Sequence, residues 1–135
     1  MPSGISALSG PEKGVQMKIA ISTSGETLES PVDPRFGRAA RFILYDSGTG
    51  QIEVVDNSPS LNAAQGAGIQ AAEKISRLGA QWLITGHCGP KAFRTLKAAG
   101  IQIVLGVEGT VRQAIDQFKA GRLKPSDAPD VQGHW

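Results

Sequence analysis

The sequence predicts an α/β fold built on a mixed five-stranded sheet. Three short apolar segments come first, and a regular alternation of helices and strands follows them. The second and third of these segments are joined by Ser47-Gly48-Thr49-Gly50, which is typical of a hairpin. Strands separated by helices run parallel, whereas a hairpin makes its two strands antiparallel. The sheet is therefore expected to contain both kinds of pairing.

Five segments have the length and apolar pattern of strands, and three have the periodicity of amphipathic helices. The predicted strands are residues 17–22, 41–46, 51–56, 82–85 and 101–105. The predicted helices are residues 66–78, 90–99 and 110–120, each followed by a glycine. Thr110 is suited to the N-cap of the last helix, and Pro90 to the first turn of the helix before it.

The composition limits the classes of protein to consider. The chain has 135 residues, the size of one domain, with a net charge of +2 and a single cysteine. A charge this small does not favour nucleic acid or an anionic membrane as a partner. One cysteine excludes an internal disulfide framework, which suits the reducing cytoplasm.

The two ends of the chain lack the periodicity of the middle. Residues 1–16 and 124–135 are rich in small and polar residues, so we expect a flexible extension and a flexible tail. Residues 17–123 form the predicted α/β domain. Neither a signal peptide nor a membrane span is evident, because no long apolar run occurs.

The segment Thr85–Pro90 is the first candidate site, because ligands of open α/β sheets bind beyond the carboxyl ends of parallel strands. Gly86 and Gly89 allow close approach of a ligand, and the following helix N-terminus attracts anions. His87 and Cys88 are the candidate metal contacts, since imidazole and thiolate are both metal ligands. A lone cysteine is also typical of a small buried hydrophobe, and that interpretation stays open.

The loop after the first strand is the second candidate site. Arg35 and Arg38 surround a glycine and suit an anionic ligand, which Phe36 would shield from water. Two alternatives remain: Arg35 pairs with Asp33, and Phe36 fills the core. The candidate binding residues of this region are Ser22, Ser24, Arg35, Phe36 and Arg38.

One pattern favours an enzyme instead. His87-Cys88, followed by Arg94-Thr95, matches the H-C-x5-R-[ST] pattern of cysteine-dependent phosphatases, in which a thiolate attacks phosphorus. Against this hypothesis, Pro90 begins the helix early and places Arg94 about one turn inside it. A third hypothesis makes the domain a regulatory module that docks onto a partner.

Taken together, the motifs resemble the dinitrogenase iron–molybdenum cofactor biosynthesis family over residues 17–123. The matching segments are MKIAIS, Asp33-x-Arg35-Phe36-Gly37-Arg38-Ala39, Phe42 to Asp46, Asn57, Gly66-Ala67-Gly68, Thr85-Gly86-x-x-Gly89-Pro90, and Gly109-Thr110-Val111 to Gly121-x-Leu123. The resemblance implies a ribonuclease H-like fold with strand order 3-2-1-4-5, the second strand antiparallel, and helices on both faces.

The same resemblance implies a small non-catalytic carrier of an anionic metal–sulfur cluster. The cargo is expected to be an iron–molybdenum cofactor precursor, or the molybdenum–copper sulfide cluster associated with orange proteins. Cluster donor and acceptor proteins are the expected partners. His87 and Cys88 would contact the metals weakly and exchangeably, while Arg35, Arg38 and loop amides would balance the charge.

Overall fold

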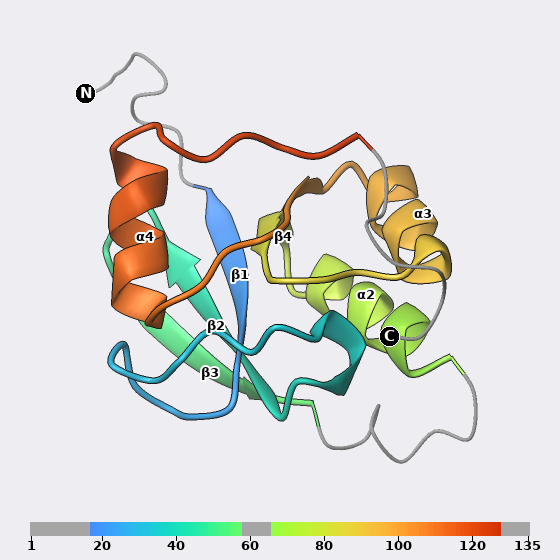
Figure 1. Cartoon of the computed structure of the whole chain (residues 1–135), viewed down its shortest axis with the longest axis horizontal. Coiled ribbons are helices and arrows are strands. Elements are labelled where there is room, and N and C mark those ends of the chain that lie inside the picture. The colour runs from blue at the N-terminus through green and yellow to red at the C-terminus, as the bar shows by residue number, and fades with distance from the viewer. Residues whose placement is uncertain (1–16, 58–65, 128–135) are drawn as a thin grey trace.

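The computed structural model describes residues 17–57 and 66–127, and a five-stranded sheet runs through it in the order β3-β2-β1-β4-β5 (Figure 1). The strands are β1 (Lys18–Thr23), β2 (Arg41–Asp46), β3 (Ile52–Asp56), β4 (Ala80–Ile84) and β5 (Gln102–Val104). The helices are α2 (Ala67–Arg77), α3 (Pro90–Ala98) and α4 (Val111–Lys119), with a short 3₁₀ turn η1 (Phe36–Arg38).

The pairing of the strands confirms the mixed sheet. β1 pairs with β2 and β2 with β3 in antiparallel register, whereas β1 pairs with β4 and β4 with β5 in parallel. The hairpin between β2 and β3 closes where Asp46 N donates to Gln51 O at 2.9 Å. Gly50, in this turn, has φ +77°, a left-handed conformation that glycine adopts without strain. The strand order and the antiparallel second strand are as expected, while the ribonuclease H-like classification stays a prediction.

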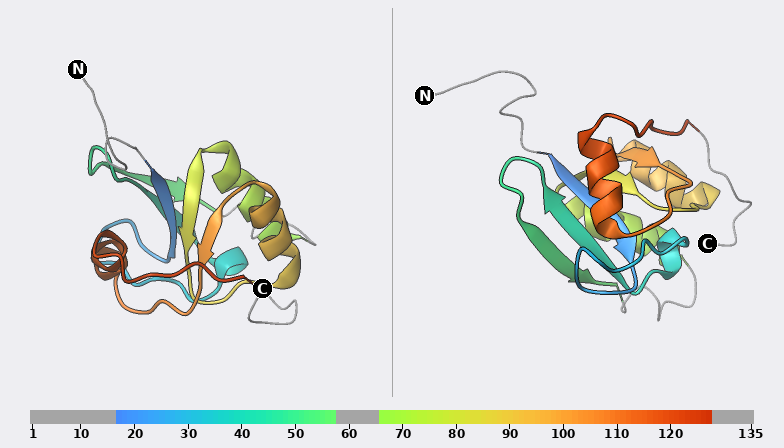
Figure 2. Two further views of the ribbon diagram at one scale, coloured as in Figure 1. Left: turned by 90° about the horizontal axis from the view of Figure 1, so that it is seen from above. Right: turned by 60° about the vertical axis from the view of Figure 1, so that its left-hand side comes forward.

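Helices cover the sheet on both faces (Figures 1 and 2). α2 and α3 pack side by side on one face and enclose a core cluster that includes Phe42, Leu83 and Leu96. α4 lies on the other face over a second cluster that includes Ile21 and Val111. β1 is central and covered on both sides, so every residue from Ile19 to Thr23 is buried.

The segment after α4 returns to the edge of the sheet. Ser126 N donates to Ile103 O at 2.6 Å, so the chain beyond Lys124 begins alongside β5. The expected flexible extension (1–16) and most of the expected tail (128–135) lie outside the described residues. Within the described part of the chain, none of the helices is long and apolar enough to span a membrane.

Replacing Thr110 with alanine is expected to lower the free energy of unfolding by about 1 kcal/mol. Thr110 Oγ1 accepts from Gln113 N at 3.1 Å, and Gln113 Oε1 accepts from Thr110 N at 2.9 Å, so two backbone amides at the start of α4 depend on this pair. Urea denaturation measures the effect. Thr95→Ala is the matched control, because the Thr95 hydroxyl only bonds back to Lys91 O within α3. Equal midpoints for the two variants would contradict a capping role.

Candidate functional site

Three loops meet at the edge of the sheet where β1, β4 and β5 end. We call these loops, residues 24–38, 85–89 and 105–110, the rim. The carboxyl ends of parallel strands reach the same edge, so the rim occupies the place where open α/β sheets bind ligands. The two loops singled out in the sequence both belong to it.

Backbone hydrogen bonds join the first two loops of the rim. His87 N donates to Pro34 O at 2.6 Å, and Phe36 N donates to His87 O at 3.1 Å. Arg35 and His87 thereby form an isolated parallel β-bridge. The rim therefore places a guanidinium-bearing residue directly beside an imidazole-bearing one.

Gly86 makes this contact possible. A Cβ on Gly86 would lie 2.7 Å from Pro34 Cα and 2.8 Å from Pro34 O, closer than side-chain carbons approach backbone atoms. The sequence predicts that this glycine allows the close approach of a ligand. Its lack of a side chain instead allows the approach of the other loop.

The third loop is tied to both of the others. Gly106 N donates to Gly86 O at 2.8 Å, and Val32 N donates to Gly109 O at 2.8 Å. A hollow of about 460 Å³ lies between residues 29–34 and 107–110, and the walls include Val32, Pro34 and Val107. The three loops thus form one hydrogen-bonded unit rather than three independent segments.

Ser22 supports the rim from below. Its side chain is completely buried, and its hydroxyl hydrogen-bonds with the Thr85 hydroxyl at 2.8 Å and with Asp33 O at 2.7 Å. The expectation that Ser22 contacts a ligand is therefore corrected: it links β1, β4 and the first loop. Thr85, the first residue of the candidate segment Thr85–Pro90, shares this role through its hydroxyl, and Asp33 shares it through its backbone carbonyl.

Arg35 and Arg38 bring positive charge to the rim. The Arg35 side chain is 49% exposed, and its Nε lies 3.9 Å from Asp33 Oδ1. That carboxylate also accepts from Arg35 N at 2.9 Å. Arg38 is exposed at the end of η1. The alternative that Arg35 pairs with Asp33 is thus correct, and the pair leaves half of the guanidinium side chain at the surface.

Phe36 fills the core rather than shielding a ligand. Its side chain is fully buried, and its ring packs against Phe42 with centroids 5.4 Å apart. Ser24 lies on the surface, where its backbone carbonyl accepts from Arg41 Nη1 at 3.2 Å. Arg41 also pairs with Glu26 at 3.2 Å, so its charge is balanced locally.

His87 and Cys88 lie on opposite sides of their loop. His87 is half-buried at the bridge with Arg35, whereas Cys88 is 0% exposed and belongs to the core cluster under α2 and α3. The expected contact of Cys88 with a metal is therefore corrected. The chain is extended at the bridge, and successive side chains of an extended chain point in opposite directions.

The same burial weakens the phosphatase hypothesis. A nucleophilic thiolate needs access to phosphorus, and the Cys88 thiol lies in the core, 3.6 Å from Gly89 O. Arg94 is exposed within α3, as the position of Pro90 at the start of the helix predicts. A cysteine-dependent phosphatase needs its thiolate and its arginine around the same phosphate. Cys88 in the core and Arg94 on the surface of α3 are not placed in this way.

The chemistry of the rim suits a preformed anion better than a bare metal ion. Among residues 17–57 and 66–127, no group of three or more His, Cys, Asp or Glu side chains is placed to hold a metal. α3 begins at the rim with Gly89 as N-cap, no side-chain cap and no acidic residue in its first turn. The positive end of the helix dipole therefore joins Arg35 and Arg38.

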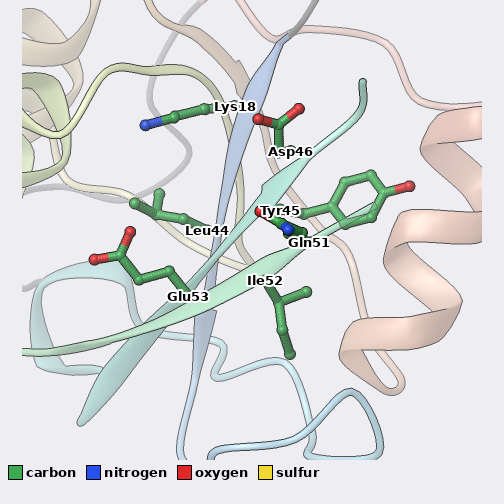
Figure 3. A pocket seen from close by; sticks show the side chains of 7 residues that line it. All are labelled: Lys18, Leu44, Tyr45, Asp46, Gln51, Ile52 and Glu53. Atoms are coloured by element: carbon green, nitrogen blue, oxygen red, sulfur yellow. The ribbon is translucent and has the colours of Figure 1, made fainter. Parts of the chain in front are cut away.

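A second hollow lies away from the rim, and its polar side chains do not point toward a common ligand position. It measures about 160 Å³ and lies beside the hairpin, at the opposite end of β1 (Figure 3). Lys18, Leu44 and Glu53 extend to one side of the strands there, and Tyr45 and Ile52 to the other (Figure 3). The polar groups of this hollow do not converge on one point.

Comparisons with known proteins identify relatives of the same fold. The high-resolution structure of the apo form of the orange protein from Desulfovibrio gigas shares 44% identity with this chain and a TM-score of 0.83, covering 85% of this chain and 97% of that one. A Thermotoga protein described as a candidate NifB protein shares 38% identity and a TM-score of 0.75, covering 87% and 99%. An uncharacterized protein of Methanocaldococcus jannaschii is 29% identical over 80% of this chain and 90% of its own length.

The family model described as dinitrogenase iron-molybdenum cofactor matches residues 17–121. This match spans all five strands and the three helices of the described structure. With the fold shared with the orange protein, it shows that the chain is a member of the dinitrogenase iron–molybdenum cofactor family.

Proposed function

We propose that this protein is a small non-catalytic carrier, which holds an anionic metal–sulfur cluster on the rim and passes it to another protein. The observation that carries this proposal is the backbone bridge between Arg35 and His87. It brings a cationic residue and a residue whose imidazole is able to ligate metals side by side, next to the N-terminus of α3. Family membership supports a role in cofactor handling, and we place that role in the cytoplasm.

Each rim residue has a distinct role in the proposed carrier. Arg35 and Arg38 balance the negative charge of the cluster, and the α3 N-terminus at Gly89 adds the field of its dipole. His87 supplies one exchangeable nitrogen ligand. Ser24 lies on the same loop as Arg35 and adds a hydroxyl at the surface. One ligand and distributed charge suit a cargo that must later be released.

The metals distinguish two versions of the cargo: a molybdenum–iron–sulfur precursor, or a molybdenum–copper sulfide cluster. Both are bulky anions, so the rim chemistry applies to each. The test is anaerobic reconstitution of the full chain with molybdate, copper, iron and sulfide, followed by desalting and elemental analysis. We expect molybdenum and sulfide to remain in fixed ratio with copper or iron. Protein that emerges free of metal under every combination would contradict the proposal.

Replacing His87 with alanine is expected to weaken cluster binding about tenfold, because one exchangeable ligand is lost while the charges remain. The visible absorption of the reconstituted cluster, titrated against protein, measures the effect. His87→Asn is the second variant, since its amide retains polarity but is a poor metal ligand. Full binding by both variants would remove His87 from the site.

Replacing Cys88 with alanine is expected to leave cluster binding unchanged, because the thiol lies in the core. The loss of one buried sulfur should lower the free energy of unfolding by about 1 kcal/mol. The same titration and urea denaturation give the two readouts. A loss of cluster with unchanged stability would restore Cys88 as a ligand and show that this loop turns over on loading.

A further inference from the structure

The outer surface of α3 carries a row of positive charge. Lys91, Arg94 and Lys97 are all exposed and stand three residues apart, so they are neighbours on one side of the helix. The opposite side packs Phe93 and Leu96 into the core. We call Lys91, Arg94 and Lys97 the α3 stripe.

The charges of the α3 stripe are not neutralised within the described structure. From Lys74 to Val107 the chain has five Lys and Arg residues and no Asp or Glu, whereas the remainder has nine against twelve. The ion pairs among the described residues involve Arg35, Arg41 and Arg112, and none involves the stripe. Although the net charge of the whole chain is only +2, the segment from Lys74 to Val107 is therefore strongly basic.

The stripe extends from the rim toward the far end of α3. α3 begins directly after the rim segment 85–89, so Lys91 lies in its first turn. Each residue advances the helix by about 1.5 Å, which places Lys97 about 9 Å beyond Lys91 along the axis. A small anion beside His87 cannot contact all three charges. A macromolecular surface laid across the rim and α3 can.

We propose that the α3 stripe docks an acidic surface of a protein partner. α2 and α3 lie together on one face of the molecule (Figure 2). The exposed charges of α2, Glu73 and Arg77, cancel each other, so the net positive charge of this layer comes from α3. Complementary charge speeds the encounter and fixes its orientation. If the rim holds the cluster, as proposed above, this docking presents the cluster to its donor or acceptor.

An acidic protein fits the stripe better than a nucleic acid does. Proteins that bind single strands stack bases on exposed aromatic rings, and Phe93, the aromatic residue of α3, is only 4% exposed. The twelve Asp and Glu residues elsewhere repel an extended polyanion, but not a compact acidic patch that covers α3 alone.

The test compares two charge reversals of equal size. One variant combines Lys91→Glu, Arg94→Glu and Lys97→Glu. The matched control combines Lys119→Glu, Arg122→Glu and Lys124→Glu, which are also exposed and change the net charge equally. Fluorescence anisotropy at low salt measures binding of a labelled peptide of alternating Glu and Ala. Thermal denaturation first confirms that both variants are folded.

We expect the stripe variant to lose about tenfold or more in peptide affinity and the control less than about threefold. Equal losses would mean that only net charge matters, and would overturn the proposal. Tighter binding of a short RNA than of the peptide, lost with the stripe, would also overturn it, because the surface would then serve nucleic acid.

Cluster loading of the same variants separates this proposal from the carrier function. Normal metal content in a stripe variant that no longer binds the peptide supports docking. Parallel loss of cluster and peptide would assign the stripe to the cargo site and overturn docking. If the wild-type chain loads no cluster but the peptide results hold, the docking surface stands and the carrier function falls.

Discussion

Replacing Gly86 with alanine is expected to force the first two loops of the rim apart. It should lower the free energy of unfolding by about 2–3 kcal/mol. The new methyl group would overlap Pro34 Cα and O, which are backbone atoms and cannot rotate away. Moving Pro34 breaks its bond with His87 N and separates Arg35 from His87. Urea denaturation and the metal content after reconstitution measure the two effects.

Gly106→Ala is the matched control for this substitution. Gly106 lies in the same rim, but nothing lies within 4 Å of an added Cβ. Its φ of +77° makes alanine there cost about 1–2 kcal/mol in backbone strain. We therefore expect this variant to lose stability and keep its cluster. If Gly86→Ala also kept its cluster, cargo binding would not depend on the bridge between Arg35 and His87.

Replacing Arg35 and Arg38 together with glutamate is expected to lower cluster affinity more than about a hundredfold. Two attractive interactions become repulsive, and each reversal acts on a multiply charged anion at short range. Titration of the reconstituted cluster by its visible absorption measures the loss. The expected effect is the largest among the binding variants because the rim offers few direct ligands.

Two companion variants keep this result interpretable. Arg35→Gln with Arg38→Gln removes the charges without placing a new carboxylate beside Asp33, and it should bind with reduced affinity and a weaker dependence on salt. Lys18→Glu with Lys119→Glu repeats the change in net charge away from the rim, because Lys18 is exposed at the start of β1 and Lys119 is exposed at the end of α4. Equal losses in this variant would show that the rim arginines have no special role.

The sequence was sufficient to predict the strands and helices, and to predict that the two candidate loops lie close together. Apolar periodicity and glycine stops located each strand and helix, and the carboxyl-edge rule predicted that residues around Arg35 and His87 would meet. Two helix signals, Pro90 and Thr110, were local and specific, so both helix starts were predicted correctly.

The sequence was not sufficient to predict the direction in which individual side chains point. Cys88 points into the core because His87 is bridged to Arg35, and that pairing joins residues more than fifty positions apart. Ser22 is buried because β1 is the central strand, covered on both faces. The strand order implied by the family resemblance already made the first strand central, so the burial of Ser22 could have been predicted from it. That Pro34 occupies the space beside Gly86 could not, because this contact joins two separate loops.

The hydrogen bond from Ser126 to Ile103 also affects how copies of this protein behave at high concentration. Open sheets tend to polymerise through unpaired outer strands, which offer free amides and carbonyls to one another. At β5 the chain itself occupies one of these carbonyls. At β3 the exposed apolar side chains of Ile52 and Val54 alternate with Glu53 and precede Asp56, so a second copy would bring like charges together. The β5 margin is thus partly closed, whereas the β3 margin, with two exposed apolar side chains, is protected only by its charges.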